Sequence, residues 1–164
     1  MSNNNNLAQK SNFTAGSDKL AFGELFLTSV NIPGINLSHP DVGGRTGTKL
    51  NLAGDTLTFN SLSFEVLVDE DFNVFHEFTG KVFDNINPET GSFASVEFDF
   101  WVDVNNSKGN KLFKMEFYNC RVESIGDIQL EVQSDETEFT LPVEVKFDYY
   151  KIFKSTDSIP ALRV

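Results

Sequence analysis

Alternation of apolar and polar residues with a period of two is the feature that most constrains how this chain folds. It is clearest in Phe93–Val104, where apolar side chains take one face and carboxylates the other. A second alternating segment, Lys111–Asn119, follows a turn at residues 105–110, so the two predict a β-hairpin. Further strands are predicted at Leu20–Val30, Leu62–Val68, Ile128–Val132 and Thr137–Tyr149. The pattern predicts a mostly β protein, an antiparallel β-sandwich or partial barrel.

One segment has helical periodicity instead. Val74, Phe78 and Val82 share a stripe about 100° wide on a helix. Asp69 or Asp71 can cap its N-terminus by accepting hydrogen bonds from the free N–H groups of the first turn. We therefore expect one short helix laid on the sheets.

The 164 residues fit a single domain with a real core. Residues 1–17 are rich in Asn, Ser and Gly and predict a flexible arm, residues 18–154 the β domain, and residues 155–164 a short tail. Residues 38–47 are turn formers nearly throughout, with Val42 as the one apolar anchor. This segment is expected to be an exposed, mobile loop that contacts partners.

Charge and cysteine content exclude several classes of function. The chain has 24 Asp and Glu against 13 Lys and Arg, a formal charge of −11, which argues against general affinity for nucleic acid. Cys120 is the only cysteine, so neither an intrachain disulfide nor a cysteine metal cluster is possible. The polar start, Met1–Asn6, does not resemble a signal peptide, and no apolar run approaches a membrane span. We expect a cytoplasm-like compartment at synthesis and no membrane partner.

Catalytic motifs are weak. His39 and His76 are far apart in the sequence, and neither has a neighbouring group at a spacing that predicts acid–base chemistry. Acidic clusters at residues 69–71 and 97–103 could serve a glycosidase or a calcium site, but a helix N-terminus and a solvated strand face explain them more simply. We therefore predict no enzyme activity, no metal site and no cofactor. A small β-sandwich binding module stays open as an alternative, with Trp101 as its one aromatic platform for a sugar.

Four segments in a fixed order resemble a known family: Ser29–Leu37 with its Ile-Pro-Gly, Gly54–Phe59, Leu62–Phe72 and Asn119–Tyr150. Together they are similar to the tail-tube family of contractile-tailed bacteriophages, and the resemblance spans Leu20–Phe153. The tail-completion and baseplate-proximal tube proteins look closest. One departure is that the family's helix often carries a tryptophan where Thr79 and Gly80 stand here.

The resemblance implies a structural virion protein. In that family a β-sandwich with one flanking helix joins sixfold into a ring, and strands of neighbouring copies close a barrel around a channel. The implied location is the virion tail, assembled in the host cytoplasm. Implied partners are further copies in a hexameric ring and other tail tube, baseplate, sheath or neck proteins, with DNA passing through the channel without specific binding. A ring at the tube end, as a completion, terminator or initiator protein, is favoured over the alternative of a main tail-tube subunit.

Two sets of residues are candidates for these roles. Carboxylates on polar strand faces would repel phosphate, so we expect them to line the channel: Glu97, Asp99, Asp103, Glu144 and Asp148. The polar loop supplies candidates for contacts between rings or subunits: His39, Asp41, Gly43, Gly44, Arg45 and Thr46.

Overall fold

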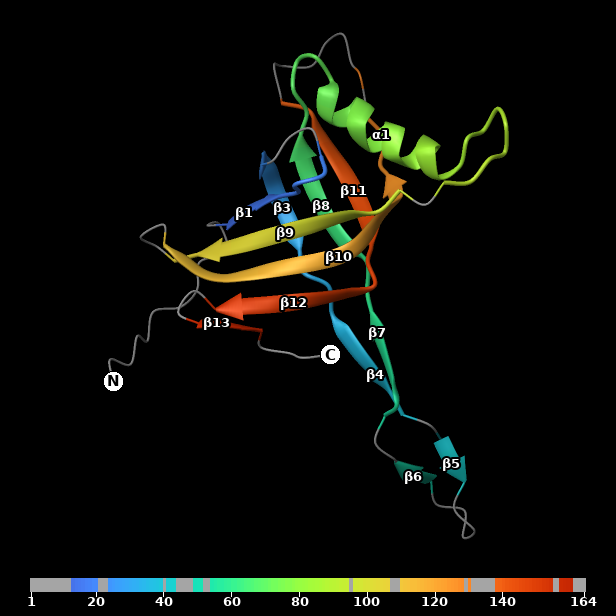
Figure 1. The fold of residues 1–164 in the computed structure, drawn as a ribbon, viewed down its shortest axis with the longest axis vertical. Helices are drawn as coiled ribbons and strands as arrows, with labels where there is room; N and C mark the ends of the chain where they lie inside the picture. Colours follow the sequence, from blue (N-terminus) through green and yellow to red (C-terminus); the bar gives the residue numbers. More distant parts are fainter. Residues whose placement is uncertain are drawn as a thin grey trace.

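The computed structural model describes residues 13–20, 24–39, 41–43, 49–51, 54–94, 96–106, 110–128, 130, 138–154 and 157–160. The protein is mostly antiparallel β with one helix (Figure 1), which confirms the predicted fold class. The strands that carry the core are β8 (Leu62–Leu67), β9 (Phe98–Asn105), β10 (Lys111–Ile125), β11 (Thr140–Lys146) and β12 (Tyr149–Lys154). Shorter strands are β1 (Phe13–Gly16), β2 (Glu24–Leu25), β3 (Leu27–Asn31) and β13 (Asp157–Pro160).

The strands form two crossed layers. One layer, the transverse layer, crosses the long axis of the molecule in Figure 1. It consists of β2, β1, β9, the first part of β10, β12 and β13. The end of β10, followed by β11, β8 and β3, makes a second layer that runs along the long axis. Every pairing is antiparallel. Crossed sheets bury one face each against the other, so their opposite faces are left for solvent or partners.

Aromatic side chains fill the space between the layers. Phe64 of the long-axis layer stacks on Phe100 of the transverse layer, with ring centroids 5.0 Å apart and 7° between the planes. Phe117 and the valines of β8, β9 and β11 are also buried. The alternation predicted these inward positions correctly, because each lies on the face that the period of two assigns to the core.

β10 belongs to both layers because it bends at Asn119. Three steps along β10, from Phe117 to Cys120, match two steps along β9, so β10 carries one extra residue there. Asn119 has φ 55°, a left-handed conformation that asparagine tolerates better than most residues. Its backbone N–H donates to Asp99 Oδ1 at 3.3 Å, and its side-chain amide donates to Asp148 Oδ2 at 2.9 Å. These two bonds fix the bend between the layers.

The helix α1 (Asn73–Asn85) covers one end of the core. Val74 and Phe78 are its buried residues, and the Phe78 ring lies 5.9 Å from Phe64. Asp69 accepts from the Val74 backbone N–H at 3.2 Å and from the Asn73 side chain at 2.7 Å, as the sequence predicted for a capping carboxylate. Burial opposes ionisation of Asp69, but these hydrogen bonds outweigh it and lower its pKa.

A narrow β-ribbon projects from the domain (Figure 1). It consists of β4 (Ile35–Ser38) paired with β7 (Thr56–Phe59), followed by β5 (Asp41–Gly43) paired with β6 (Lys49–Asn51). The register places apolar residues on one face of the β4–β7 ribbon, here called the apolar stripe: Ile35, Leu37, Leu57 and Phe59. Phe59 anchors the ribbon by packing on Phe147 and Tyr150, with centroids 5.5 and 5.4 Å apart.

Several expectations about the chain ends need correction. The arm predicted for residues 1–17 includes β1, which pairs with β9 and buries Ala15. Its small residues, Thr-Ala-Gly, show no alternation, which is why composition alone did not indicate a strand. Residues 1–12 lie outside the described residues. In the predicted tail, residues 157–160 form β13 on β12, while residues 155–156 and 161–164 also lie outside the described part.

Other strand predictions were partly wrong. Thr137–Tyr149 is not one strand: β11 ends at Lys146 and β12 starts at Tyr149, each in a different layer. β11 carries Pro142 although it lies between β10 and β8, and the irregular pairing falls on β10 between Val122 and Ser124. Ile128 is not in a strand, and Val132 lies outside the described residues.

Replacing Asn119 tests whether the bend depends on its left-handed backbone. Asn119→Ala should lower the free energy of unfolding by about 1–2 kcal/mol, since a Cβ is disfavoured at positive φ and the hydrogen bond to Asp148 is lost. Asn119→Gly removes the same bond without the steric cost and is the matched control. Urea unfolding curves should rank wild type, then Gly, then Ala; an Ala variant as stable as the Gly variant would contradict this reading.

Candidate functional site

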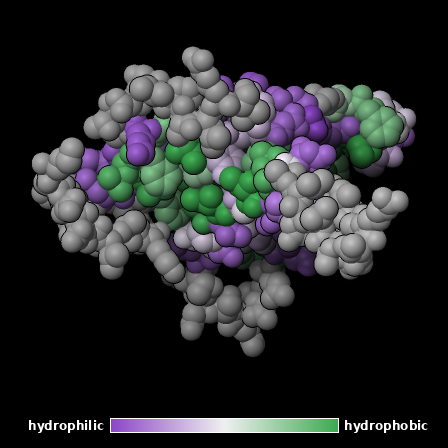
Figure 2. Space-filling view, turned by 90° about the horizontal axis from the view of Figure 1, so that it is seen from below, coloured by the Kyte–Doolittle hydropathy of each residue, from purple (hydrophilic) through white to green (hydrophobic). Residues whose placement is uncertain are grey.

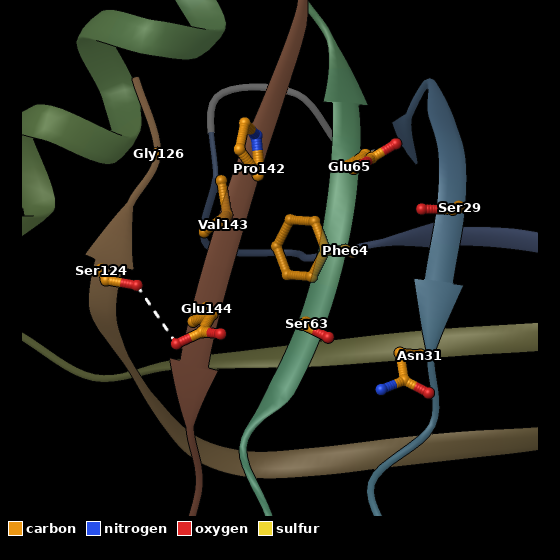
Figure 3. A pocket seen from close by; sticks show the side chains of 10 residues that line it. All are labelled: Ser29, Asn31, Ser63, Phe64, Glu65, Ser124, Gly126, Pro142, Val143 and Glu144. Atoms are coloured by element: carbon orange, nitrogen blue, oxygen red, sulfur yellow. Dashed lines mark hydrogen bonds between the residues drawn. The ribbon is translucent and has the colours of Figure 1, made fainter. Parts of the chain in front are cut away.

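A shallow groove of about 290 Å³ lies on the outer side of the long-axis layer (Figure 3). We call its side chains the polar face: Ser29 and Asn31 of β3, Ser63 and Glu65 of β8, Ser124 of β10 and Glu144 of β11. Pro142, Gly126, Phe64 and Val143 complete the lining. On β8 and β11 the polar residues alternate with core residues, while Ser124 of β10 and Ser29 of β3 follow irregular steps in the pairing.

The strand register sets the side chains of the polar face side by side. Glu144 lies opposite Ser63, and Ser63 lies opposite Asn31. Ser124 Oγ donates to Glu144 Oε2 at 3.3 Å, and Thr28 Oγ1 donates to Glu65 Oε2 at 3.3 Å. The result is a surface of short hydroxyls and amides with two carboxylates, and its described lining contains neither lysine nor arginine.

The outer side of the transverse layer has different chemistry. We call it the aromatic face: Trp101, Lys114, Glu116, Tyr118, Tyr149 and Lys151. Tyr118 and Tyr149 stack with centroids 4.9 Å apart. Lys151 Nζ lies 5.0 Å from the Tyr118 ring centre, and Lys114 Nζ lies 5.5 Å from that of Trp101. A cation over a ring face is attracted by the ring electrons, so each lysine ammonium group has a favourable contact within the chain.

Glu116 is the central carboxylate of the aromatic face. Its Oε1 lies 2.7 Å from Lys114 Nζ, and its Oε2 accepts from the Tyr118 hydroxyl at 2.6 Å. Burial disfavours its charged form, but these two hydrogen bonds outweigh burial and lower the pKa of Glu116. Burial and the bond to Glu116 together raise the pKa of Tyr118, so the phenol stays protonated as a donor.

The structure separates the five carboxylates proposed for a channel wall. Glu144 lies on the polar face. Asp99 and Asp148 hold the bend of β10 through Asn119, and Asp99 also lies 3.8 Å from Lys19 Nζ.

Glu97 pairs with Arg121, whose guanidinium reaches Glu97 Oε1 at 2.5 Å, and this bond raises the pKa of Arg121. Asp103 was expected on a solvated strand face, and that expectation is wrong. Only 1% of it is exposed, because β1 pairs alongside it and Lys111 Nζ lies 2.5 Å from its Oδ2.

The described residues of the polar loop, the segment 38–47, lie beyond the β4–β7 part of the ribbon, except Ser38, which ends β4. His39 is exposed just beyond β4. Asp41 and Gly43 belong to β5, which pairs with β6, a strand pair that the turn-forming sequence did not predict. Gly44, Arg45 and Thr46 lie outside the described residues. The expected mobility and partner contacts of this loop therefore stay predictions.

The ribbon exposes apolar side chains. Ile35, Leu37 and Leu57 of the apolar stripe are each about half exposed, at 48–49%. Figure 2 views the molecule from the end where the ribbon projects and shows hydrophobic residues gathered there between hydrophilic ones. An isolated two-stranded ribbon with one exposed apolar face gains stability when a partner covers that face.

Two edges of the long-axis layer carry no partner strand among the described residues. β3 pairs only with β8 there. β9 leaves β10 at Cys120, so the Val122–Ile125 end of β10 pairs with β11 alone. An edge strand presents unpaired backbone N–H and C=O groups, which favour pairing with another chain.

The described part of the chain has few groups suited to catalysis. It contains no group of three or more His, Cys, Asp and Glu residues placed to hold a metal ion. Burial raises the pKa of Cys120 to about 12, which keeps it a buried thiol without nucleophilic character. Among these residues, none of the helices has the length and apolar character needed to cross a bilayer.

Comparison with known proteins supports one fold. No protein-family model matches the chain, and no curated protein matches its sequence. The solved structures do match. The tube-terminating cap of the anti-feeding prophage has a TM-score of 0.69 at 14% identity, covering 92% of this chain and 93% of that one.

A chain of the anti-feeding prophage baseplate, symmetrised six-fold, has a TM-score of 0.69 at 11% identity over 94% and 98% of the two chains. Hcp1 from Salmonella typhimurium has a TM-score of 0.52 at 12% identity over 85% and 83%. The chain has the tail-tube fold that the sequence resemblance implied. Its structural neighbours are tube, cap and baseplate proteins of contractile injection systems.

Of the polar face, only Glu144 was among the site residues predicted from the sequence. Ser63 and Glu65 interleave with Leu62, Phe64 and Val66, so the alternation already marked them as outward-facing. Ser29 and Asn31 were harder to recognise, since an irregular step in β3 between Leu27 and Ser29 breaks the period.

Glu116→Gln tests the charge on the aromatic face. The variant should lose about 1 kcal/mol of unfolding free energy at pH 7, because the ion pair with Lys114 and the charged acceptor for Tyr118 both disappear. A lowered folded-state pKa means that this stability is present above the ordinary glutamate pKa, about 4.3, and is lost as pH falls through the lower folded value. Urea unfolding at pH 7 and pH 3 should show a difference that shrinks on acidification; a constant difference would contradict the assignment.

Proposed function

We propose that the chain is a structural, non-catalytic subunit of a contractile tail or tail-like injection particle. It forms a hexameric ring at one end of the tube, as a completion, terminator or initiator protein. The match to a tube-terminating cap over nine-tenths of both chains carries this proposal. The six-fold symmetrised baseplate chain, matched over 94% of this one, supports the same ring symmetry.

The long-axis layer supports ring closure on physical grounds. It has four antiparallel strands, in the order β10, β11, β8 and β3, so its two edge strands run in opposite directions. Rotation about a ring axis preserves strand direction along that axis. Pairing β3 of one copy with the end of β10 in the next therefore continues the antiparallel alternation around the ring. Closure removes both free edges, which would otherwise promote aggregation.

A closed ring of such sheets encloses a channel. Barrels of about 16–18 strands already leave an aqueous lumen, and six four-stranded sheets exceed that number. The polar face points away from the core and suits the channel wall, since its short side chains lack the cations and rings that retain nucleic acid. Glu65 and Glu144 add negative charge there. Glu97, Asp99 and Asp148 fit this role less well because none of them lines the groove of the polar face.

The remaining surfaces fit contacts with other tail components. The β4–β7 ribbon with its apolar stripe projects beyond the domain (Figure 1) and would contact a neighbouring ring, which can be another tube, baseplate or neck protein. In a bacteriophage the channel would pass DNA without specific binding, and the virion tail would assemble in the host cytoplasm.

Two alternatives make different predictions. A main tail-tube subunit would form long stacks of rings from one purified protein, whereas an end protein would stop at one ring or one layer. A carbohydrate-binding module needs a free aromatic platform, but Trp101 is only partly exposed, and Lys111 Nζ and Lys114 Nζ lie 5.9 and 5.5 Å from its ring centre.

Ring formation is the direct test of the proposal. Negative-stain images and mass photometry of the full chain over a range of concentrations should show six-fold rings with a central hole. The same rings should form when the protein is added to isolated tubes or baseplates. A folded chain that stays monomeric at every concentration, and that neither particle captures, would contradict the proposal.

Charge reversal tests which face lines the channel. Glu65→Lys with Glu144→Lys should give rings that retain short DNA, with affinity that falls steeply with salt, because each lysine releases counterions from phosphate. Asp84→Lys with Glu89→Lys gives the same change in net charge on the helix side and serves as the control. Gel-shift titrations at several salt concentrations measure both; equal DNA retention by the two variants would place the polar face away from the channel.

A further inference from the structure

We propose that Phe26 of each copy seats in a groove beside α1 of the next copy around the ring, forming the apolar anchor of the subunit interface. The inference rests on the proposed ring but goes beyond it, because it names the two surfaces that meet. It starts from an unusual exposure: 79% of Phe26 is accessible, at the start of the free edge strand β3.

The receiving groove lies between α1 and the chain that continues from β10. Its volume is about 550 Å³. Phe75, Thr79 and Val82 of α1 form one wall, and Ile125 and Ile128 form the other. All five side chains are partly buried, and the four apolar ones pack against the core. The groove therefore has two apolar walls held in place by the core, and exposed Glu123, Ser124 and Asp127 complete its lining.

The strand register places the two surfaces at the same height along the sheet. Ile125 pairs with Val143, which pairs with Phe64, which in turn pairs with Val30. Farther along, the Leu67 N–H donates to the Phe26 carbonyl at 2.8 Å, and Leu67 lies opposite Thr140.

Counting the same steps along the other edge starts from Gly126, whose N–H donates to the Pro142 carbonyl at 2.8 Å. The two strands are antiparallel, so two residues back from Pro142 corresponds to two residues forward from Gly126. These steps reach Thr140 and Ile128. Phe26 on one edge and Ile128 on the other are thus level with each other. If Val30 of one copy pairs with Ile125 of the next, so that the register continues across the edge, Phe26 of the first copy comes level with Ile128 and the groove of the second.

The occupant is a second copy of this chain for that reason. The interface is head-to-tail, with different patches on its two sides, which is the type that closes into rings. A rigid aromatic side chain entering an apolar pocket is the usual energetic centre of a protein interface. Phe93 is equally exposed, at 81%, but it lies beyond the far end of α1 and has no such relation to a free edge.

Disulfide trapping in the full chain tests the contact. Cys120 is buried with a raised pKa and does not interfere. Phe26→Cys combined with Val82→Cys in one chain should give, after mild oxidation, a ladder of covalent oligomers ending at the closed ring. Thr58→Cys combined with Val82→Cys places an equally available thiol on the ribbon and should give no ladder.

A second measurement covers the case of a poorly placed disulfide. Phe26→Ala should raise the concentration needed for ring assembly by about tenfold or more, whereas Phe93→Ala should leave it unchanged, with both variants keeping wild-type unfolding curves. Two results together would overturn this inference: Phe26→Ala assembles at the wild-type concentration, and the Phe26→Cys, Val82→Cys variant gives no ladder. The proposed function would then stay intact. A wild-type chain that never forms rings, alone or on a tube, would overturn both.

Discussion

The bend of β10 at Asn119 is the constraint on which the rest of the structure depends. One continuous strand pairs with β9 and β12 before the bend and with β11 after it, so a single residue sets how the two layers cross. The crossing creates the aromatic core around Phe64, Phe100 and Phe117. It also leaves each layer with one outer face. Asp99 and Asp148 stabilise this bend by accepting hydrogen bonds from Asn119. These two carboxylates therefore have a structural role, although the sequence pattern predicts them to face solvent.

The two outer faces differ in a way that suits different surroundings. On the aromatic face, lysines, tyrosines, Trp101 and Glu116 satisfy one another through ring contacts and ion pairs. On the polar face, small hydroxyls and two carboxylates form a shallow groove with little to hold a passing polyanion. The polar face also belongs to the layer whose two edges have no partner strand among the residues that the structure describes. Edge pairing and a non-adhesive surface therefore occur on the same sheet, the combination needed for a channel built from repeated copies.

Sequence periodicity predicted which segments form strands better than it predicted which strands pair with one another. Leu62–Val68 and the hairpin were recognisable because inward and outward residues alternate along most of β8, β9 and β10, although β9 begins at Phe98 and not at the predicted Phe93. The alternation could not separate Asp99 from Asp103, since both have the same phase, and only the pairing of β1 beside β9 buries Asp103. It also could not show that the last long segment breaks at Phe147 and Asp148 and changes layers. The grouping of Ser29, Ser63 and Glu144 depends on strand order and register, which are tertiary properties.

The central claim is that the β10–β11–β8–β3 layer closes with its copies into a ring whose polar face lines the channel. A cryo-electron microscopy map of the assembled ring, at a resolution that shows strand pairing, measures this directly. The account predicts backbone hydrogen bonds between β3 of one copy and Val122–Ile125 of the next, with Ser63, Glu65 and Glu144 facing the axis. A ring whose axis faces Trp101, Tyr118 and Lys151 instead, or whose copies meet without pairing these edges, would contradict it.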